Sequence, residues 1–227
     1  TALLFAQKYL STALPKGART IKDVIMSKTK RAIRRTFLSG FGKGTVGAVL
    51  LTLASFASAQ GEQSLSEILN YRQYTPLFSS AGQPSREQLP LIKEAGYDRV
   101  IYIAFNNGRT AIPEEDQLVK DLGMDYLHIA VDFNNPTIRD FDAFADAMQR
   151  EPESKTFLHC QVNARATAFS FLYRVLYQGV DIAEAKADMN TVWQPNEVWR
   201  DFIFAVMADR GMSHECETCD WTPPASN

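Results

Sequence analysis

Cysteine is scarce in this sequence. Only three of the 227 residues are cysteines, Cys160, Cys216 and Cys219, which is an odd number for pairing. Cys216 and Cys219 are close enough in the sequence to pair with each other, which would leave Cys160 as the lone thiol that a nucleophile requires. The alternative is a metal site of His214, Cys216 and Cys219, but one Cys-x-x-Cys without a second pair is a weak zinc signal. We therefore expect neither a metal nor another cofactor.

Long apolar runs are also missing. The apolar run at residues 46–56, VGAVLLTLASF, is too short to span a bilayer comfortably. It follows the cationic segment SKTKRAIRR and precedes the small residues ASA at 57–59. These three parts are typical of a secretory signal that is cut before Gln60. We therefore expect no stable membrane span in the mature protein.

The leader at residues 1–59 leaves the route of export open. Met26 stands directly before the cationic segment, so we expect translation to start there and residues 1–25 to be an upstream extension. The sequence RRTFL at residues 34–38 resembles a twin-arginine export signal, with ordinary Sec export as the alternative. A retained membrane anchor is disfavoured by the short apolar run. The expected location is the periplasm or the outside of the cell.

Basic residues become sparse after the leader. Residues 1–59 hold 10 Lys and Arg against one acid, whereas residues 60–227 hold 14 Lys and Arg against 25 Asp and Glu. The body is thus strongly acidic although the whole chain has a formal net charge of only −2. Because a phosphate backbone needs a cationic face, this composition argues against nucleic acid as a partner.

The body alternates apolar strand-like segments with amphipathic helical ones, and it contains no internal repeat or low-complexity segment. Such alternation predicts an α/β domain with a central, mainly parallel sheet of four or five strands flanked by helices. We place this domain at residues 60–211 and an exposed tail at 212–227. The predicted strands lie in 74–84, 99–104, 126–131 and 156–160, and the predicted helices in 85–96, 113–123, 137–150, 165–179, 181–190 and 196–211.

Residues with capping chemistry mark several predicted helix starts. Thr137 has Asp140 three positions later, and the pairs Ser85 with Gln88 and Asp181 with Glu184 have the same spacing. The acids in PEEDQ, at residues 113–117, stand where the positive end of a helix dipole favours them.

Cys160 stands where the apolar strand TFLHC meets a predicted helix. At the carboxyl end of a central strand, the backbone N–H groups of residues 161–166 would form a bowl that binds an anion and stabilises a thiolate. Arg165 could hold two oxygens of a bound oxyanion with its planar fork. A cysteine, an arginine and a ring of amides can support phosphoryl transfer without metal. A buried core cysteine and a surface ion-pairing arginine are the alternatives.

A proton donor is needed for the leaving oxygen, and Asp132 is our candidate general acid. It ends the strand before Cys160, and we expect the two strands to be adjacent and parallel, so that both residues reach one edge of the sheet. A turn-capping role for Asp132 is a close alternative. His159 is expected to pack or hydrogen-bond behind the loop rather than to act catalytically itself.

An ordered set of segments resembles the bacterial protein-tyrosine-phosphatase-like family, in its beta-lactamase-hydrolase-like, dual-specificity-type branch. The segments are SAGQPSREQL, AGYDRVIYI, PEEDQLVKDLGMDYLHIAVDF, PTIRDFDAF, HCQVNARATAF and VWQPNEVW, and the match covers roughly residues 68–205. The resemblance implies a cysteine-phosphatase fold in which Cys160 is the nucleophile, Arg165 the phosphate binder and Asp132 the acid. It further implies a phosphate-binding loop made of Gln161, Val162, Asn163, Ala164, Arg165 and Ala166, supported by His159 and Thr167.

The loop departs from the common pattern of this family. Four residues, rather than five, separate Cys160 from Arg165, a spacing also typical of rhodanese-type sulfurtransferases that carry a persulfide. Asn163 replaces a common glycine and tolerates left-handed geometry better than most residues. Ala166 stands where a hydroxyl usually follows the arginine, and Thr167 comes one position later.

Hydrolysis of phosphomonoesters through a phosphocysteine is therefore the function that the sequence favours, on a phosphorylated protein or small molecule. A sulfurtransferase that uses a Cys160 persulfide and a non-catalytic phosphate-binding module are the alternatives. The sequence makes no prediction of an oligomeric state.

Overall fold

The computed structural model describes residues 64–224. The expectations about the leader, the start at Met26, the export signal and the cut before Gln60 lie outside the described residues.

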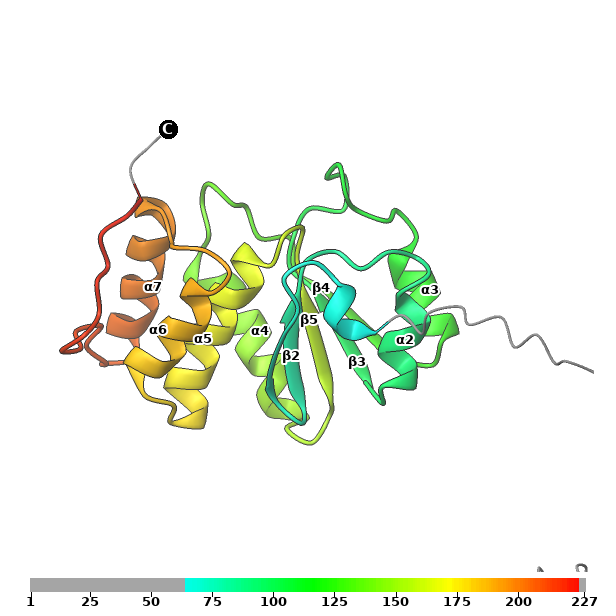
Figure 1. The fold of residues 1–227 in the computed structure, drawn as a ribbon, viewed down its shortest axis with the longest axis horizontal. Coiled ribbons are helices and arrows are strands. Elements are labelled where there is room, and N and C mark those ends of the chain that lie inside the picture. The colour runs from blue at the N-terminus through cyan, green and yellow to red at the C-terminus, as the bar shows by residue number, and fades with distance from the viewer. Residues whose placement is uncertain (1–63, 225–227) are drawn as a thin grey trace, which may run out of the picture. The chain divides into compact units, whose positions relative to one another are not determined.

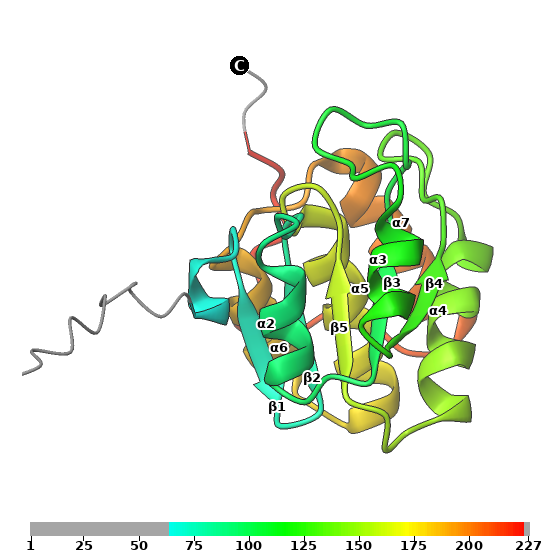
Figure 2. The same ribbon diagram turned by 90° about the vertical axis from the view of Figure 1, so that its right-hand side faces the viewer.

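A five-stranded sheet in the order β1-β2-β5-β3-β4 forms the centre of the described chain (Figure 2). Its strands are β1 (Arg72–Thr75), β2 (Phe78–Ala81), β3 (Arg99–Tyr102), β4 (Asp125–His128) and β5 (Thr156–His159). Strands β2, β5, β3 and β4 pair in parallel, and only β1 pairs antiparallel, with β2. This arrangement confirms the predicted α/β class and the mainly parallel sheet. It places β5, with parallel neighbours on both sides, at the centre.

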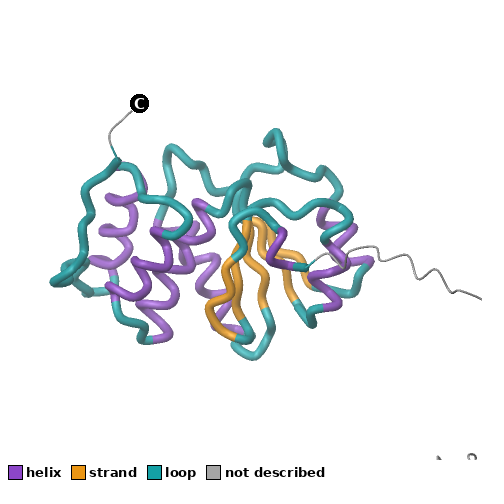
Figure 3. Tube along the Cα trace, viewed as in Figure 1, coloured by secondary structure: helices purple, strands orange, loops and turns teal. Residues whose placement is uncertain are grey.

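Helices cover both faces of the sheet (Figures 1 and 3). One face carries η1 (Leu65–Glu67), α2 (Leu89–Glu94) and α3 (Glu115–Asp121). On the other face lie α4 (Ile138–Arg150) and α5 (Ala164–Gln178), and α6 (Ile182–Asn190) and α7 (Glu197–Asp209) pack outside them. Apolar side chains fill the space on each side, with Phe157 facing the first group of helices and Leu158 the second, because successive strand residues point to opposite faces.

Two predicted elements differ in the structure. The segment read as one strand with a Gly/Pro turn is a hairpin, because Pro76 and Leu77 form a turn between β1 and β2. The helix expected at 85–96 is confined to α2, which begins at Leu89 and has Pro90 in its first turn. Proline lacks the backbone donor for helix hydrogen bonds and is tolerated only in the first helical turn, so the regular helix begins just before Pro90.

The capping prediction for α4 is confirmed. Asp140 N donates to the Thr137 hydroxyl, and the Thr137 backbone N–H donates to Asp140 Oδ2 over 2.9 Å. Asp181 caps α6 in a similar way, by accepting from the backbone N–H groups of Ala183 and Glu184. These contacts satisfy donors that the first helical turn leaves unpaired.

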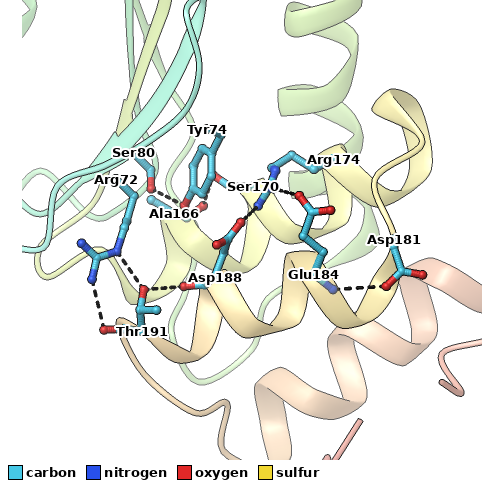
Figure 4. Close-up of polar contacts among 10 residues, drawn as sticks. All are labelled: Arg72, Tyr74, Ser80, Ala166, Ser170, Arg174, Asp181, Glu184, Asp188 and Thr191. Atoms are coloured by element: carbon cyan, nitrogen blue, oxygen red, sulfur yellow. Dashed lines mark hydrogen bonds and ion pairs between the residues drawn. The ribbon is translucent and has the colours of Figure 1, made fainter. Parts of the chain in front are cut away.

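Polar contacts connect α5 to α6 and α6 to the sheet edge (Figure 4). The buried Arg174 of α5 pairs with Asp188 of α6 over 2.6 Å. Arg72 of β1 donates from Nε to the Thr191 hydroxyl, which follows α6, over 2.8 Å. Helix α5, whose first turn carries Arg165, is therefore held from outside as well as by its apolar surroundings.

The tail at residues 212–224 lies along the outer helices. Cys216 and Cys219 form a disulfide with a Cα–Cα distance of 5.3 Å, so neither sulfur is a free thiolate for a metal. The expectation of an exposed tail does not hold for Trp221, whose ring packs against Phe171 and Phe204 with centroid distances of 5.6 and 5.2 Å. Among the described residues, no helix has the length and apolar character needed to cross a membrane.

Candidate active site

Cys160 directly follows β5 at the carboxyl edge of the sheet. Its backbone N–H donates to the Ala81 oxygen at the end of β2 over 3.3 Å, which continues the parallel ladder. Only residues 161–163 separate Cys160 from the first residue of α5. The site thus lies where open α/β sheets commonly bind ligands.

Backbone contacts pin the short loop to neighbouring segments. Val162 forms an isolated antiparallel bridge with Gly82, and Gln83 N donates to the Gln161 oxygen over 3.1 Å. A Cβ at Gly82 would lie 3.1 Å from both the Gln161 oxygen and the Leu69 side chain, so glycine permits this close approach. The Gln161 side chain itself reaches Gly108 in the loop after β3.

Asn163 makes the turn from the loop into α5. Its φ of 70° is left-handed, a conformation that Asn adopts more readily than most side-chain-bearing residues. Its side chain is buried, and its Nδ2 donates to the Asn70 oxygen over 2.6 Å. The Asn163 oxygen then accepts from Thr167 N over 2.8 Å, which starts the helical ladder. Helix α5 therefore begins at Ala164, and Arg165 lies within its first turn rather than at the end of a longer loop.

Arg165 is buried beneath the loop that follows β4, not on the surface. The guanidinium carbon lies 5.1 Å from the centre of the Phe133 ring, and the residue is 7% exposed. Among the described residues, its Nε has no hydrogen-bond partner. A buried cation with an unused N–H is suited to a partner such as an oxyanion, whereas an arginine in a surface ion pair would be exposed.

The sulfur of Cys160 is not open to solvent. The residue is 0% exposed and belongs to the apolar cluster between the sheet and α4, α5 and α7. Cys160 is therefore enclosed by its neighbours, and the bowl of N–H groups expected at residues 161–166 stays a prediction.

Asp132 lies in the loop after β4, but its strand is not the neighbour of β5. Strand β3 lies between them, so the expected adjacency of the two strands is wrong. The loop still reaches the site, because the next residue, Phe133, contacts Arg165. Asp132 is half-buried, and its Oδ1 accepts from Asn134 N over 2.9 Å, a turn contact that fits the capping alternative as well.

The remaining predicted loop residues have contrasting surroundings. Val162 is 49% exposed at the rim, whereas Ala164 and Ala166 are buried. Thr167 is also buried, and its hydroxyl has no hydrogen-bond partner among the described residues. Ala164 and Ala166 have no polar side chain, so these two residues can offer an anion only their backbone N–H groups.

His159 and Glu115 form a buried polar contact behind the loop. The imidazole is 0% exposed and stacks on Tyr102 with a centroid distance of 4.7 Å. Its Nε2 lies 3.4 Å from Glu115 Oε1, and Glu115 is 2% exposed. Burial lowers the pKa of His159 to about 3 and raises the pKa of Glu115 to about 7.

Glu115 was not predicted as part of the site. The sequence placed it among three acids at the start of a helix, where the helix dipole explains them all. Glu114 and Asp116 do lie at the surface, in ion pairs with Arg86 and Lys120. Only the fold shows that the middle acid points inward, since a carboxyl in the first turn of α3 can face either way.

Comparisons with known proteins agree with this geometry. No protein-family model matches the sequence, and no curated protein matches it. Among solved structures, a "Putative phosphatase (DUF442)" from Shewanella putrefaciens CN-32 is 33% identical, with a TM-score of 0.59 over 64% of this chain and 96% of that chain.

Two more distant structures share the fold alone. Tk-PTP in its active form is 12% identical, with a TM-score of 0.53 over 61% of this chain and 97% of that chain. TpbA from P. aeruginosa, a Cys-to-Ser variant in complex with pTyr, is 14% identical, with a TM-score of 0.51 over 62% of this chain and 86% of that chain.

A central parallel strand that ends in a cysteine, followed by a short loop and an arginine in the first helical turn, defines a domain of the cysteine-phosphatase-like class. With 33% identity across 96% of the S. putrefaciens protein, the chain belongs to the DUF442 family of protein-tyrosine-phosphatase-like proteins. It is therefore homologous to a putative phosphatase.

Proposed function

We propose that the protein is a cysteine-dependent phosphatase that hydrolyses a phosphomonoester. The observation that carries this proposal is the buried Arg165, with an unpartnered Nε, at the start of the helix that follows the Cys160 loop. A phosphate held there would meet a guanidinium and the free N–H groups of a helix N-terminus, which together balance its negative charge.

The proposed reaction has two steps. The Cys160 thiolate attacks phosphorus, the bond from phosphorus to the ester oxygen breaks, and the Asp132 carboxyl gives its proton to the leaving oxygen. Water then attacks the phosphocysteine, Asp132 takes a proton from that water, and phosphate leaves as the thiolate re-forms. The backbone N–H groups of residues 161–166 would hold the equatorial oxygens throughout together with Arg165.

A sulfurtransferase is the second candidate, and the compact loop favours it. Because α5 begins at Ala164, only three residues form the turn above Cys160, a small cradle that suits a persulfide. In this reaction the thiolate attacks the outer sulfur of thiosulfate and releases sulfite. Cyanide then removes that sulfur as thiocyanate and restores the thiolate.

We further propose that residues 60–211 are the catalytic domain and that the protein is exported to the periplasm or beyond. Support for the domain comes from the continuous sheet and helices between Leu65 and Asp209. Support for export comes from the leader sequence and from the Cys216–Cys219 disulfide, since disulfides persist mainly in oxidising compartments.

A side-by-side assay tests the chemistry. The protein is given an aryl phosphate, and in parallel thiosulfate with cyanide, with Cys160→Ser as the inactive variant and Arg86→Lys as a surface control. We expect release of phosphate that Cys160→Ser abolishes and Arg165→Lys strongly reduces, because lysine lacks the planar fork. Thiocyanate formation without phosphate release would replace the proposal by the sulfurtransferase. Thermal stabilisation by phosphate or vanadate without either turnover would leave only a binding module.

A further inference from the structure

Glu115 occupies a position that the phosphatase mechanism does not use. Its carboxyl is buried between α3 and the sheet, where Gln83 Nε2 donates to Oε1 over 2.7 Å and the Tyr126 hydroxyl donates to Oε2 over 3.4 Å. The third polar neighbour is His159 Nε2, 3.4 Å from Oε1. A buried carboxyl with this many polar contacts is built into the fold, since an unpaired buried charge would be costly.

His159 connects that carboxyl to the reactive loop. It is the last residue of β5, so its backbone continues directly into Cys160. Its ring is fully buried, and neither nitrogen completes a hydrogen bond of good geometry among the described residues. The Glu115 carboxyl, 3.4 Å from Nε2, is the charged or acidic side chain that lies within ion-pair distance of this imidazole.

Burial opposes a charge on either partner. It lowers the pKa of His159, against the opposing effect of the Cys160 backbone, and it raises the pKa of Glu115, against the hydrogen bonds from Gln83 and Tyr126. Although the two groups lie at ion-pair distance, a protonated Glu115 carboxyl beside a neutral His159 imidazole is therefore the favoured state at mildly acidic pH. The other titratable groups that act on the pair are Tyr126 and His128, and Tyr102, which stacks on His159, is in turn influenced by Cys160 and Arg165.

We propose that Glu115 is a positioning residue: it shares one proton with His159, fixes the imidazole tautomer behind Cys160, and makes the Cys160 loop sensitive to pH. When the Glu115 carboxyl is protonated, it donates to Nε2, and the imidazole must carry its own hydrogen on Nδ1. When the carboxyl loses that proton, Nε2 becomes the donor and the hydrogen leaves Nδ1. The link to catalysis rests on the proposed role of Cys160, but the tautomer change does not.

NMR of the imidazole nitrogens tests the proposal without any enzymatic assay. The chain has three histidines, so His128→Asn and His214→Asn assign the signals of His159. In the unmodified protein we expect His159 to stay neutral and to change tautomer between about pH 6 and pH 8, around the pKa of about 7 of Glu115. In Glu115→Gln the Nδ1–H tautomer should persist throughout, because an amide can donate to Nε2 but cannot ionise.

Two further variants make this result decisive. Glu114→Gln removes a neighbouring exposed carboxylate and should behave like the unmodified protein. Tyr126→Phe keeps the ring but removes a donor to Oε2, so it should move the tautomer change to higher pH. A His159 tautomer that is constant from pH 5 to pH 9 in the unmodified protein, or one that changes identically in Glu115→Gln, would overturn the proposal.

Activity provides the functional readout. If the phosphatase proposal is correct, kcat/KM of the unmodified protein should change with pH as Glu115 titrates, and this change should be absent in Glu115→Gln. The effect of Glu115→Gln on kcat at pH 6 should be smaller. A profile that is unchanged in Glu115→Gln would refute the link to Cys160. Absence of aryl phosphate turnover in every variant would instead refute the phosphatase, while the NMR result would still decide the role of Glu115.

Discussion

Asn70 and Asn163 join the segment before β1 to the Cys160 loop through two hydrogen bonds. Asn163 Nδ2 donates to the Asn70 oxygen over 2.6 Å, and Asn70 Nδ2 donates to the Val162 oxygen over 2.9 Å. Both residues are left-handed, with φ of 53° for Asn70 and 70° for Asn163. The segment before β1 thereby fixes the turn that leads from Cys160 into α5.

Substitutions at Asn70 should separate the cost of the hydrogen bond from the cost of the backbone. Asn70→Gly keeps the left-handed conformation and loses one donor, so we expect a loss of about 1 kcal/mol in the free energy of unfolding. Asn70→Ala adds a left-handed alanine, so we expect a loss of about 2 kcal/mol. Urea denaturation measures both, with Asn135→Ala in an exposed loop as the control. Equal losses for Gly and Ala would show that the backbone conformation carries no cost.

Much of the fold is predictable from the sequence because local chemistry and the tertiary structure agree. Thr137 and Asp140 cap α4 as their spacing predicts, and the apolar run before Cys160 is the central strand. The order of the strands is not predictable in this way. Strand β5 lies between β2 and β3, so β3 separates the strand before Cys160 from the strand before Asp132. No local pattern records which strands become neighbours.

The candidate site likewise has features that local sequence predicts and features that it does not. The cysteine at the end of a strand, the nearby arginine and an asparagine suited to left-handed geometry can all be read from local sequence. The inward direction of Glu115 and the burial of Cys160 depend on contacts between segments far apart in the chain, so sequence spacing does not predict them.

Asp132→Asn should slow the reaction in a way that depends on the leaving group. The amide oxygen can still accept from Asn134 N, so the turn should persist, but it cannot deliver a proton. We expect kcat for phenyl phosphate to fall by about 100-fold or more, and kcat for p-nitrophenyl phosphate to fall much less, because nitrophenolate leaves without a proton. Steady-state kinetics measures both, with Asp146→Asn on the exposed face of α4 as the control. An equal effect on the two substrates would contradict a role as general acid.

Trp221 should anchor the tail to the outer helices. Its ring lies against Phe171 and Phe204, and the Lys186 ammonium lies 4.8 Å from its centre. Because the ring is only partly buried, we expect Trp221→Ala to cost about 2 kcal/mol in the free energy of unfolding, less than a fully buried tryptophan. Thermal or urea unfolding measures this, with the exposed Val198→Ala on α7 as the control. A loss no larger than that of the control would mean that the tail is not anchored by this side chain.

The stability of the protein should reveal the buried pair through its dependence on pH. Glu115 has a pKa raised from 4.5 to about 7, so the folded state holds a proton that the unfolded state releases, and this term lowers stability as pH rises from about 4.5 to 7. His159 has a pKa lowered from 6.5 to about 3, so the unfolded state binds the extra proton, and this term lowers stability as pH falls from about 6.5 to 3. The two slopes are opposite and cancel where they overlap, between about pH 4.5 and 6.5.

When either Glu115 or His159 is replaced, the pH dependence of the unfolding free energy should follow the titration of the remaining group. We expect Glu115→Gln to lose stability as pH falls below about 6.5, and His159→Gln to lose stability as pH rises from about 4.5 to 7, each by up to about 1.4 kcal/mol per pH unit. Urea denaturation at a series of pH values measures the slopes, and Glu114→Gln should match the unmodified protein above about pH 5 because its carboxylate is exposed. Parallel curves for Glu115→Gln and His159→Gln would mean that these groups do not hold their protons as a neutral pair, since only opposite displacements of two buried pKa values produce slopes of opposite sign.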